Sequence, residues 1–212
     1  MNRTLLAGCL LLLAPTGWGA EPLSPIESYR KLEFPPKEEN FEEGWKDRVA
    51  ADYDVINSAD LTSLRAALRD ENPFVRAIAA YALGVRSDTA SADALAELVK
   101  NDKEYVVRIR AVEALALLKR KPEVLEAAQQ DLEPGVPFVA RLVAGQFGSD
   151  IDYAAQIRQA YAAGIDREAM GSAEVGQPAP DFTALTIDGE PFQLSSVLGK
   201  KPIAIYFAAF DG

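Results

Sequence analysis

The residue types that could perform catalysis or bind a metal are scarce in this chain. Its 212 residues include one cysteine, Cys9, and no histidine. Cysteine and serine nucleophiles are commonly activated by histidine, and structural zinc sites are built from cysteine and histidine. Neither kind of site can be assembled here, and a single cysteine cannot form an intrachain disulfide. We therefore expect no catalytic residue within the chain, no cofactor and no metal.

Neighbouring carboxylates are the remaining candidates for acid–base chemistry. Glu42 and Glu43 form one pair, and Asp52 and Asp54 form another. General acid–base catalysis needs a carboxyl group positioned against a substrate. Both pairs fall on a predicted helix that is acidic along its length, so a solvated helix face is the better interpretation of them.

The overall charge limits the classes of partner. The chain has 22 basic and 32 acidic residues, which gives a formal net charge of −10. An acidic field repels the phosphate backbone of DNA and RNA, so we expect no nucleic-acid binding.

The first 20 residues have the composition of a secretory signal peptide. Arg3 precedes an apolar run from Leu5 to Ala14, and small residues follow. The run is about half of the roughly 20 residues that span a bilayer, so we expect no stable membrane insertion after cleavage. Residues 6–9 match a lipoprotein cleavage box at Cys9, but cleavage there would leave almost no apolar region before it. The sequence predicts an exported protein, periplasmic or secreted.

The segment after the signal peptide leads into a helix. Residues 21–40 contain four prolines and scattered charges without sustained periodicity, which predicts an irregular lead segment. Residues 41–58 carry apolar side chains at steps of three and four, with Asn40 in the N-cap position. The apolar positions are Phe41, Trp45, Val49, Tyr53 and Ile56. We expect this helix to cover the open end of the region that follows, in preference to a ligand site at Trp45.

Residues 59–170 repeat themselves. Residues 73–75, Pro-Phe-Val, recur at 137–139, an offset of 64. Val75 and Arg76 are echoed by Val107 and Arg108 at half that offset. The sequence therefore predicts three units of about 32 residues. One helix pair cannot bury its apolar face alone, so a stack of three is needed to form a core.

Each unit has the same layout: a first helix with an apolar stripe, a polar turn and a second helix. The stripes are Leu61, Leu64 and Leu68; Leu95, Leu98 and Val99; and Val124, Leu125 and Ala128. The turns are residues 70–73, 101–104 and 131–137. Proline is favoured in the first turn of a helix, where its missing N–H is not needed. Small residues in the second helices allow successive pairs to approach closely; these are Ala79, Ala80, Ala82, Ala111 and Ala114.

Two arginines recur at the start of the second helices. Arg76 and Arg108 occupy equivalent positions, and Ala140 replaces them in the third unit. We expect the arginines to pair with turn carboxylates of a neighbouring unit, in preference to a substrate, and we expect the third unit to make different turn contacts.

The pattern of residues 72–84, Asn-Pro-Phe-Val-Arg-Ala-Ile-Ala-Ala-Tyr-Ala-Leu-Gly, resembles the HEAT repeat in the short form found in bacterial arrays. The resemblance covers roughly residues 61–148, with residues 151–165 as a closing helix. It implies an α-solenoid that offers a surface to a protein partner.

After residue 170 the periodicity changes from that of a helix to that of strands. Residues 175–182 lead to Leu185-Thr186-Ile187, then Asp188-Gly189, then residues 191–194. An Asp-Gly pair between two short apolar runs predicts a β-hairpin. Residues 195–199 predict a helical turn that ends on glycine, and residues 203–210 predict a buried strand.

The order of these motifs resembles the opening of the redoxins, which are thioredoxin-like proteins. The group includes the alkyl hydroperoxide reductase and thiol antioxidant proteins, thiol-disulfide oxidoreductases and proteins similar to iodothyronine deiodinase. The resemblance implies a cysteine or selenocysteine nucleophile at or just after Gly212, where a helix N-terminus would lower its pKa. Residues 171–212 are thus expected to be a truncated redoxin domain. An in-frame UGA codon for selenocysteine and an ordinary break both remain open as explanations.

The sequence thus predicts a mainly α fold: a HEAT-like α-solenoid of about three helix pairs, plus a truncated α/β thioredoxin-like segment. Two functions follow. The intact parent would be an exported thiol or selenol oxidoreductase, inactive as this chain stands, or the array would be a non-catalytic interaction scaffold of the cell envelope. Some lyases that attach bilin pigments carry similar repeats, but export and the tail argue against that activity. The oligomeric state is left open.

Overall fold

The computed structural model describes residues 22–32, 45–147, 152–166, 178–179, 181–186 and 190–200. Several predictions fall outside these residues. They are the signal peptide, the helix start at Asn40 and Phe41, the buried strand at 203–210 and the nucleophile position at Gly212.

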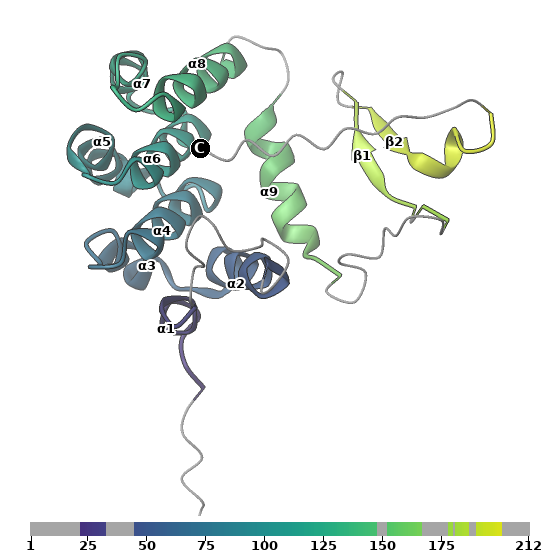
Figure 1. The fold of residues 1–212 in the computed structure, drawn as a ribbon, viewed down its shortest axis with the longest axis horizontal. Helices are drawn as coiled ribbons and strands as arrows, with labels where there is room; N and C mark the ends of the chain where they lie inside the picture. Colours follow the sequence, from purple (N-terminus) through teal and green to yellow (C-terminus); the bar gives the residue numbers. More distant parts are fainter. Residues whose placement is uncertain are drawn as a thin grey trace, which may run out of the picture.

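The described part of the chain is mainly helical, and its helices form two layers (Figure 1). The outer layer consists of α3 (Leu61–Ala67), α5 (Ala92–Asn101) and α7 (Pro122–Ala128). The inner layer consists of α2 (Trp45–Ser58), α4 (Pro73–Val85), α6 (Tyr105–Leu118) and α8 (Gly135–Phe147). Each outer helix contacts the inner helix that follows it, and successive inner helices contact one another. The three predicted helix pairs are confirmed as α3–α4, α5–α6 and α7–α8.

Helix starts follow the predicted turn chemistry in the first unit and depart from it in the third. The Asn72 side chain accepts a hydrogen bond from the Phe74 N–H at 2.9 Å, and Pro73 is the first residue of α4. α8 begins at Gly135, two residues before the proline that the repeat places first. Pro137 therefore lies in the first turn of α8, where its missing N–H breaks no helical hydrogen bond.

The lead segment is not irregular throughout, because α1 (Pro25–Arg30) lies within it. The Ser24 hydroxyl accepts from the Glu27 N–H at 3.3 Å, and the Glu27 carboxylate accepts from the Ser24 N–H at 3.0 Å. This capping box, with Pro25 at the first helical position, is sufficient to start a helix. The prolines in residues 21–40 favoured an irregular segment, so this capping box was not recognised from the sequence. α1 packs against α2, α3 and α4, and buries Ile26 and Tyr29.

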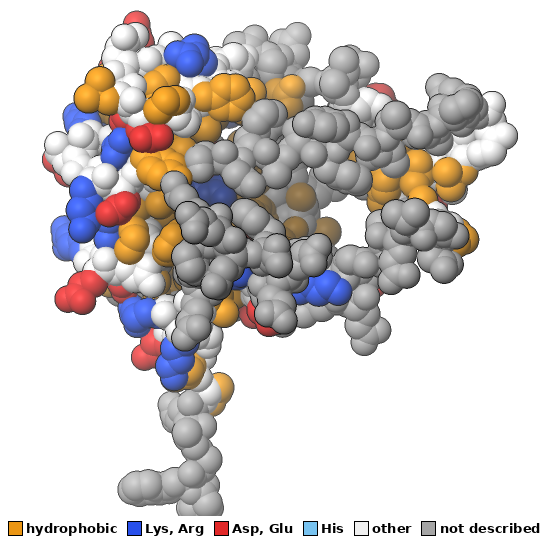
Figure 2. Space-filling view, viewed as in Figure 1, with side chains coloured by type: hydrophobic (Ala, Val, Ile, Leu, Met, Phe, Trp, Pro, Cys, Tyr) orange, Lys and Arg blue, Asp and Glu red, His pale blue; other side chains and the backbone are white. Residues whose placement is uncertain are grey.

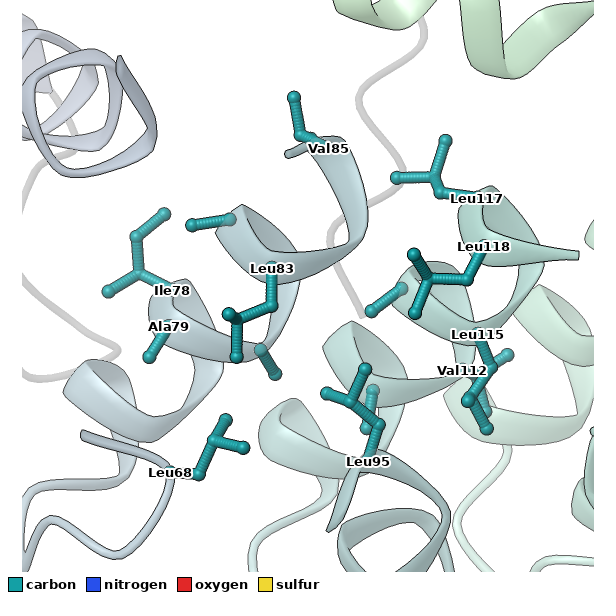
Figure 3. Close-up of a cluster of buried hydrophobic side chains, with 14 of the residues drawn as sticks. Leu68, Ile78, Ala79, Leu83, Val85, Leu95, Val112, Leu115, Leu117 and Leu118 are labelled. Atoms are coloured by element: carbon teal, nitrogen blue, oxygen red, sulfur yellow. The ribbon is translucent and has the colours of Figure 1, made fainter. Parts of the chain in front are cut away.

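The core runs continuously between the two layers, and Figure 3 shows its part formed by α4, α5 and α6. Leu83, Leu95 and Leu115 are fully buried there. α4 and α6 approach closely at Gly84: a Cβ added to this glycine would lie 2.6 Å from the Ala114 Cα. The expected role of small residues is confirmed at this contact.

The predicted closing helix is α9 (Tyr153–Ala163). It is not a further layer of the stack, because it lies against α2, α4 and α6 on the side away from the outer layer (Figure 1). We call this surface of α2, α4 and α6 the inner face.

A short antiparallel hairpin lies beyond α9. β1 (Thr183–Leu185) pairs with β2 (Pro191–Gln193), with Thr183 opposite Gln193. A 3₁₀ turn, η2 (Leu194–Ser196), follows directly. The hairpin was predicted, but its first strand lies two residues earlier than expected, and the Asp188-Gly189 turn is outside the described residues. None of the helices in the described ranges is long and apolar enough to cross a membrane.

Candidate protein-interaction surface

The repeated arginines tie each unit to the next at the turns. Arg76 of α4 donates from Nε and Nη2 to the two carboxylate oxygens of Asp102, both at 2.8 Å. Its Nη1 donates to the backbone oxygens of Asp70 and Glu71, at 2.9 and 3.1 Å, in its own turn. One guanidinium therefore holds two consecutive turns together, using the fork geometry that suits arginine to a carboxylate.

The same contacts repeat one unit later. Arg108 of α6 donates to the Asp131 carboxylate at 2.8 and 2.9 Å, and to the backbone oxygens of Asp102 and Lys103 at 3.0 and 3.3 Å. Ahead of both, Arg30 of α1 pairs with Asp70. We call these three pairs the turn ladder.

Each aspartate of the turn ladder also closes its own turn. Asp70, Asp102 and Asp131 accept from the N–H two residues on, at 2.9, 3.0 and 2.9 Å. A carboxylate that accepts one backbone N–H and two guanidinium N–H groups has three of its roughly four acceptor sites occupied within the fold. This leaves little capacity for a ligand and confirms the structural interpretation of Arg76 and Arg108.

The central pair is the most buried. The side chains of Arg76 and Asp102 are 9% and 6% exposed, against 15% for both Arg108 and Asp131. Burial alone would raise the pKa of Asp102, but Arg76 and the Glu104 N–H outweigh burial and hold the pKa below its usual value. Hydrogen bonding to Arg108 likewise lowers the pKa of Asp131.

The turn ladder ends where the sequence departs from the repeat. Ala140, which takes the place of the arginines, is completely buried in α8. A methyl group cannot donate a hydrogen bond, so α8 cannot clamp a further turn in the same way. The predicted change in the contacts of the third unit is confirmed.

The inner face shows the opposite behaviour: its chemistry changes from unit to unit. The position of Ile78 in α4 is occupied by Arg110 in α6 and by Leu142 in α8. The position of Tyr81 is occupied by Glu113 in α6. These two positions lie three residues apart, on one helical face. Sequence comparison of the units could have found this surface, because the core positions between them keep their apolar character.

A tyrosine cluster occupies this face. The ring of Tyr161 on α9 lies 4.8 Å from that of Tyr53 on α2 and 5.9 Å from that of Tyr81 on α4, measured between centroids. The hydroxyls of Tyr81 and Tyr161 share a hydrogen bond, and burial raises the pKa of both phenols. The Arg110 guanidinium lies 5.0 Å from the Tyr81 centroid and pairs with Glu113 at 2.9 Å. A cation over an aromatic face is a common recognition element.

Asp52 corrects one interpretation of the paired carboxylates. Asp54 is exposed, as a solvated face requires, but Asp52 is half-buried beside α1. Burial raises the pKa of Asp52, although a hydrogen bond from Tyr29 and the charges of Arg110 and Arg48 act in the opposite direction. Sequence periodicity missed this contact because the partner, Tyr29, comes from the segment expected to be irregular. Glu42 and Glu43 lie outside the described residues.

Arg158 of α9 binds the ends of two inner helices. Its Nε donates to the Val85 oxygen of α4 at 3.0 Å, and its Nη2 donates to the Leu117 oxygen of α6 at 2.8 Å. The last carbonyls of a helix have no intrahelical partner and form the negative end of its dipole. The next amides after α6 bond elsewhere, Lys119 N–H to Ala116 and Arg120 N–H to Leu115. Arg158 supplies the donor these ends need.

Arg86 performs the same task one helix earlier. Its Nη1 donates to the oxygens of Ile56 and Ala59 at 3.2 and 3.0 Å, at the end of α2. The equivalent position in the next unit is Leu118, which cannot cap the end of α4. The repeat therefore leaves the end of α4 to be capped from outside, and Arg158 of α9 donates to the ends of both α4 and α6.

The chemistry of these surfaces favours binding. Within the described ranges, no three carboxylate, cysteine or histidine side chains are grouped so as to hold a metal ion. Figure 2 shows basic and acidic side chains interspersed over the outer layer, with no single-sign patch there. The inner face combines aromatic rings, arginines and helix ends, which are the groups that recognise another polypeptide.

Comparison with known proteins gives one match. Residues 55–116 match the family of HEAT repeats, a range that runs from the second half of α2 through most of α6. No curated protein and no solved structure matches the chain. The match and the stacked helix pairs together show that the chain contains a HEAT-like helical repeat array.

Proposed function

We propose that this chain is a protein-interaction scaffold and that its inner face binds a segment of a partner protein. The proposal rests on where the sequence departs from the repeat. The core and the turn ladder repeat between units, whereas Tyr81, Arg110 and Glu113 change the chemistry of one face.

A helical array suits this role physically. Each unit contacts only its neighbours, so stacking produces an extended surface whose shape depends on the repeat and whose chemistry depends on the variable positions. The turn ladder fixes the relative positions of the inner helices at their N-terminal ends. Tyrosine and arginine dominate binding energy at protein interfaces, since both combine a large contact area with hydrogen bonding.

Site-specific photo-crosslinking in producing cells tests the proposal. A photoreactive residue replaces Leu142, which is 44% exposed and continues the inner face onto α8. The control replaces Glu97, which is exposed on α5 in the outer layer. The proposal predicts a discrete crosslinked partner from position 142 and none from position 97. Equal crosslinking from both positions, or crosslinking from position 97 alone, would contradict it.

We also propose that the chain is exported, on the composition of residues 1–20. The test compares the cell fraction and the size of the full chain with those of a chain that begins at residue 21. Export predicts processing and an extracytoplasmic location for the first chain only. The same location for both would contradict it.

We propose a redoxin as a second candidate function, on the order of the sequence motifs in residues 175–210. Within the described residues, β1 and β2 form a hairpin, and the Asp181 carboxylate accepts from the Ser195 N–H at 2.8 Å in the 3₁₀ turn that follows. The test measures thiol-dependent reductase activity of this chain and of one extended with the codons that follow in the genome. The redoxin proposal predicts activity in the extended chain only; no gain would exclude it.

A further inference from the structure

α9 lies on the inner face in the manner of a bound peptide. Four of its residues, Ala154, Ile157, Arg158 and Tyr161, fall at steps of three and four and so share one side of the helix. Ala154 is buried, and Ile157 and Tyr161 pack against the core. This spacing is the one by which amphipathic helices bind grooves in other proteins.

Polar contacts join α9 to the stack beside these apolar ones. Arg158 binds the ends of α4 and α6, the Asn57 amide donates to the Tyr161 backbone oxygen at 3.1 Å, and Lys119 pairs with Asp152 at 3.5 Å. Ala154 is the one residue of α9 that is buried. A helix of 11 residues is marginal on its own in water, so α9 depends on these contacts for its structure.

The inner face, in contrast, presents acceptors that belong to the repeat stack. No arginine of the next unit caps the end of α4, because Leu118 stands at the position equivalent to Arg86, and Arg158 donates to the ends of both α4 and α6. The rings of Tyr53 and Tyr81 flank the position of a third ring. The face therefore specifies a ligand: a helix with an arginine three residues before a tyrosine.

We infer that the inner face recognises a partner helix with an apolar residue, an arginine and a tyrosine at the spacing of Ile157, Arg158 and Tyr161, and that α9 is a resident occupant that such a helix displaces. The inference rests on the proposed scaffold function and specifies the side chains that the partner must carry. α9 then acts as an intramolecular competitor, which lowers the apparent affinity for the partner.

The test uses the full chain and a labelled, end-blocked peptide of residues 152–165. In the variant R158M/Y161A, the resident helix lacks its two anchors, so the peptide should bind at least tenfold more tightly than it binds the unmutated chain. Peptides with R158M or Y161A should lose at least tenfold in affinity. A peptide with Q159A, on the exposed side of the helix, should bind as the parent does. An arginine-to-lysine peptide should bind more weakly than the parent, because an ammonium cannot span both helix ends in the same way.

A measurement on the unmutated chain covers the case in which R158M/Y161A fails to fold. A saturating concentration of the peptide should increase amide hydrogen exchange in α9 and leave α5 and α7 unchanged. The inference is overturned if the peptide binds neither chain, binds both equally, or binds without exposing α9. In those cases, a partner crosslinked at position 142 would leave the scaffold proposal standing, so failures of the two proposals are distinguishable.

Discussion

The contacts at the N-terminal ends of the inner helices repeat from unit to unit, whereas those at the C-terminal ends do not. At their N-terminal ends, the turn ladder repeats the same arginine–aspartate contact from unit to unit with nearly the same distances. At their C-terminal ends, Arg86 caps one helix, and Arg158, from outside the repeat, caps the next two. Contacts that hold units together are conserved between units, whereas the surface away from them is free to diverge.

On the same helices, the ladder residues therefore serve stability and the inner-face residues serve recognition. The side chains of the Arg76–Asp102 and Arg108–Asp131 pairs are at most 15% exposed and are committed to partners within the fold. The inner-face side chains, such as Arg110, are half-exposed and lie among rings and charges. Changes at the ladder should therefore alter the free energy of unfolding, and changes at the inner face should alter binding.

The largest effect is expected for Arg76→Met. The change leaves the Asp102 carboxylate buried without its cation, which costs about 3–5 kcal/mol in similar pairs. Urea denaturation at neutral pH measures the loss. Arg108→Met should cost less, because Arg108 and Asp131 are more exposed. Lys103→Met, at a solvent-exposed turn position, is the control and should stay within about 0.5 kcal/mol. A loss below about 1 kcal/mol for Arg76→Met would contradict a structural ladder.

Gly84→Ala should be the next most severe change. The new methyl would meet the Ala114 backbone at 2.6 Å, and overpacking of this kind costs about 1–3 kcal/mol. Gly145→Ala is the matched control, since nothing lies within 4 Å of its added Cβ and alanine favours a helix by roughly 1 kcal/mol. Thermal unfolding should show a lower Tm for the first variant and an equal or higher Tm for the second. The reverse order would exclude tight packing of α4 against α6.

The turn ladder should make the stability depend on pH in the acidic range. The pKa of Asp102 is below 3.8 in the fold, so its stabilisation is complete above the unfolded pKa and is lost as the pH falls through the folded one. Unfolding free energy should therefore decrease below about pH 4. The decrease should be smaller in Arg76→Met, in which the pKa of Asp102 is no longer depressed. An equal decrease in both proteins would show that the ladder is not its source.

The smallest effect is expected for Asp52→Asn. The pKa of Asp52 is raised by burial, so its charged form is less favourable in the fold than in the unfolded chain. At neutral pH, the variant should be as stable as the parent or more stable, within about 0.5 kcal/mol. As the pH falls toward 4, the parent should gain stability relative to the variant, because the folded state takes up the proton first.

The sequence predicted the stack because local signals and the repeat agree. Proline at the first turn, apolar stripes and small residues at the 32-residue offset each have a local physical cause, and the structure confirms them at Pro73, Leu95 and Gly84. Even the partners of Arg76 could be predicted, since the turn carboxylate recurs at the same offset.

The contacts that α9 and α1 make with the stack could not be predicted in the same way. Tyr161, Arg158 and Tyr29 come from segments outside the repeat, and their positions depend on how α9 and α1 fold back on the stack. No sequence offset relates them to Tyr53, Tyr81 or Asp52. Asn57 and Tyr161, which are hydrogen-bonded, lie 104 residues apart in the chain, so no local sequence pattern reveals this contact.

Amide hydrogen exchange in Arg158→Met tests whether the stack held by the turn ladder is independent of the helix on its inner face. Exchange should become faster in α9 and in the last turns of α4 and α6, while protection in the centres of α4, α5 and α6 should not change. Faster exchange throughout the stack would contradict this independence, because α9 would then be part of the core and not an occupant of its surface.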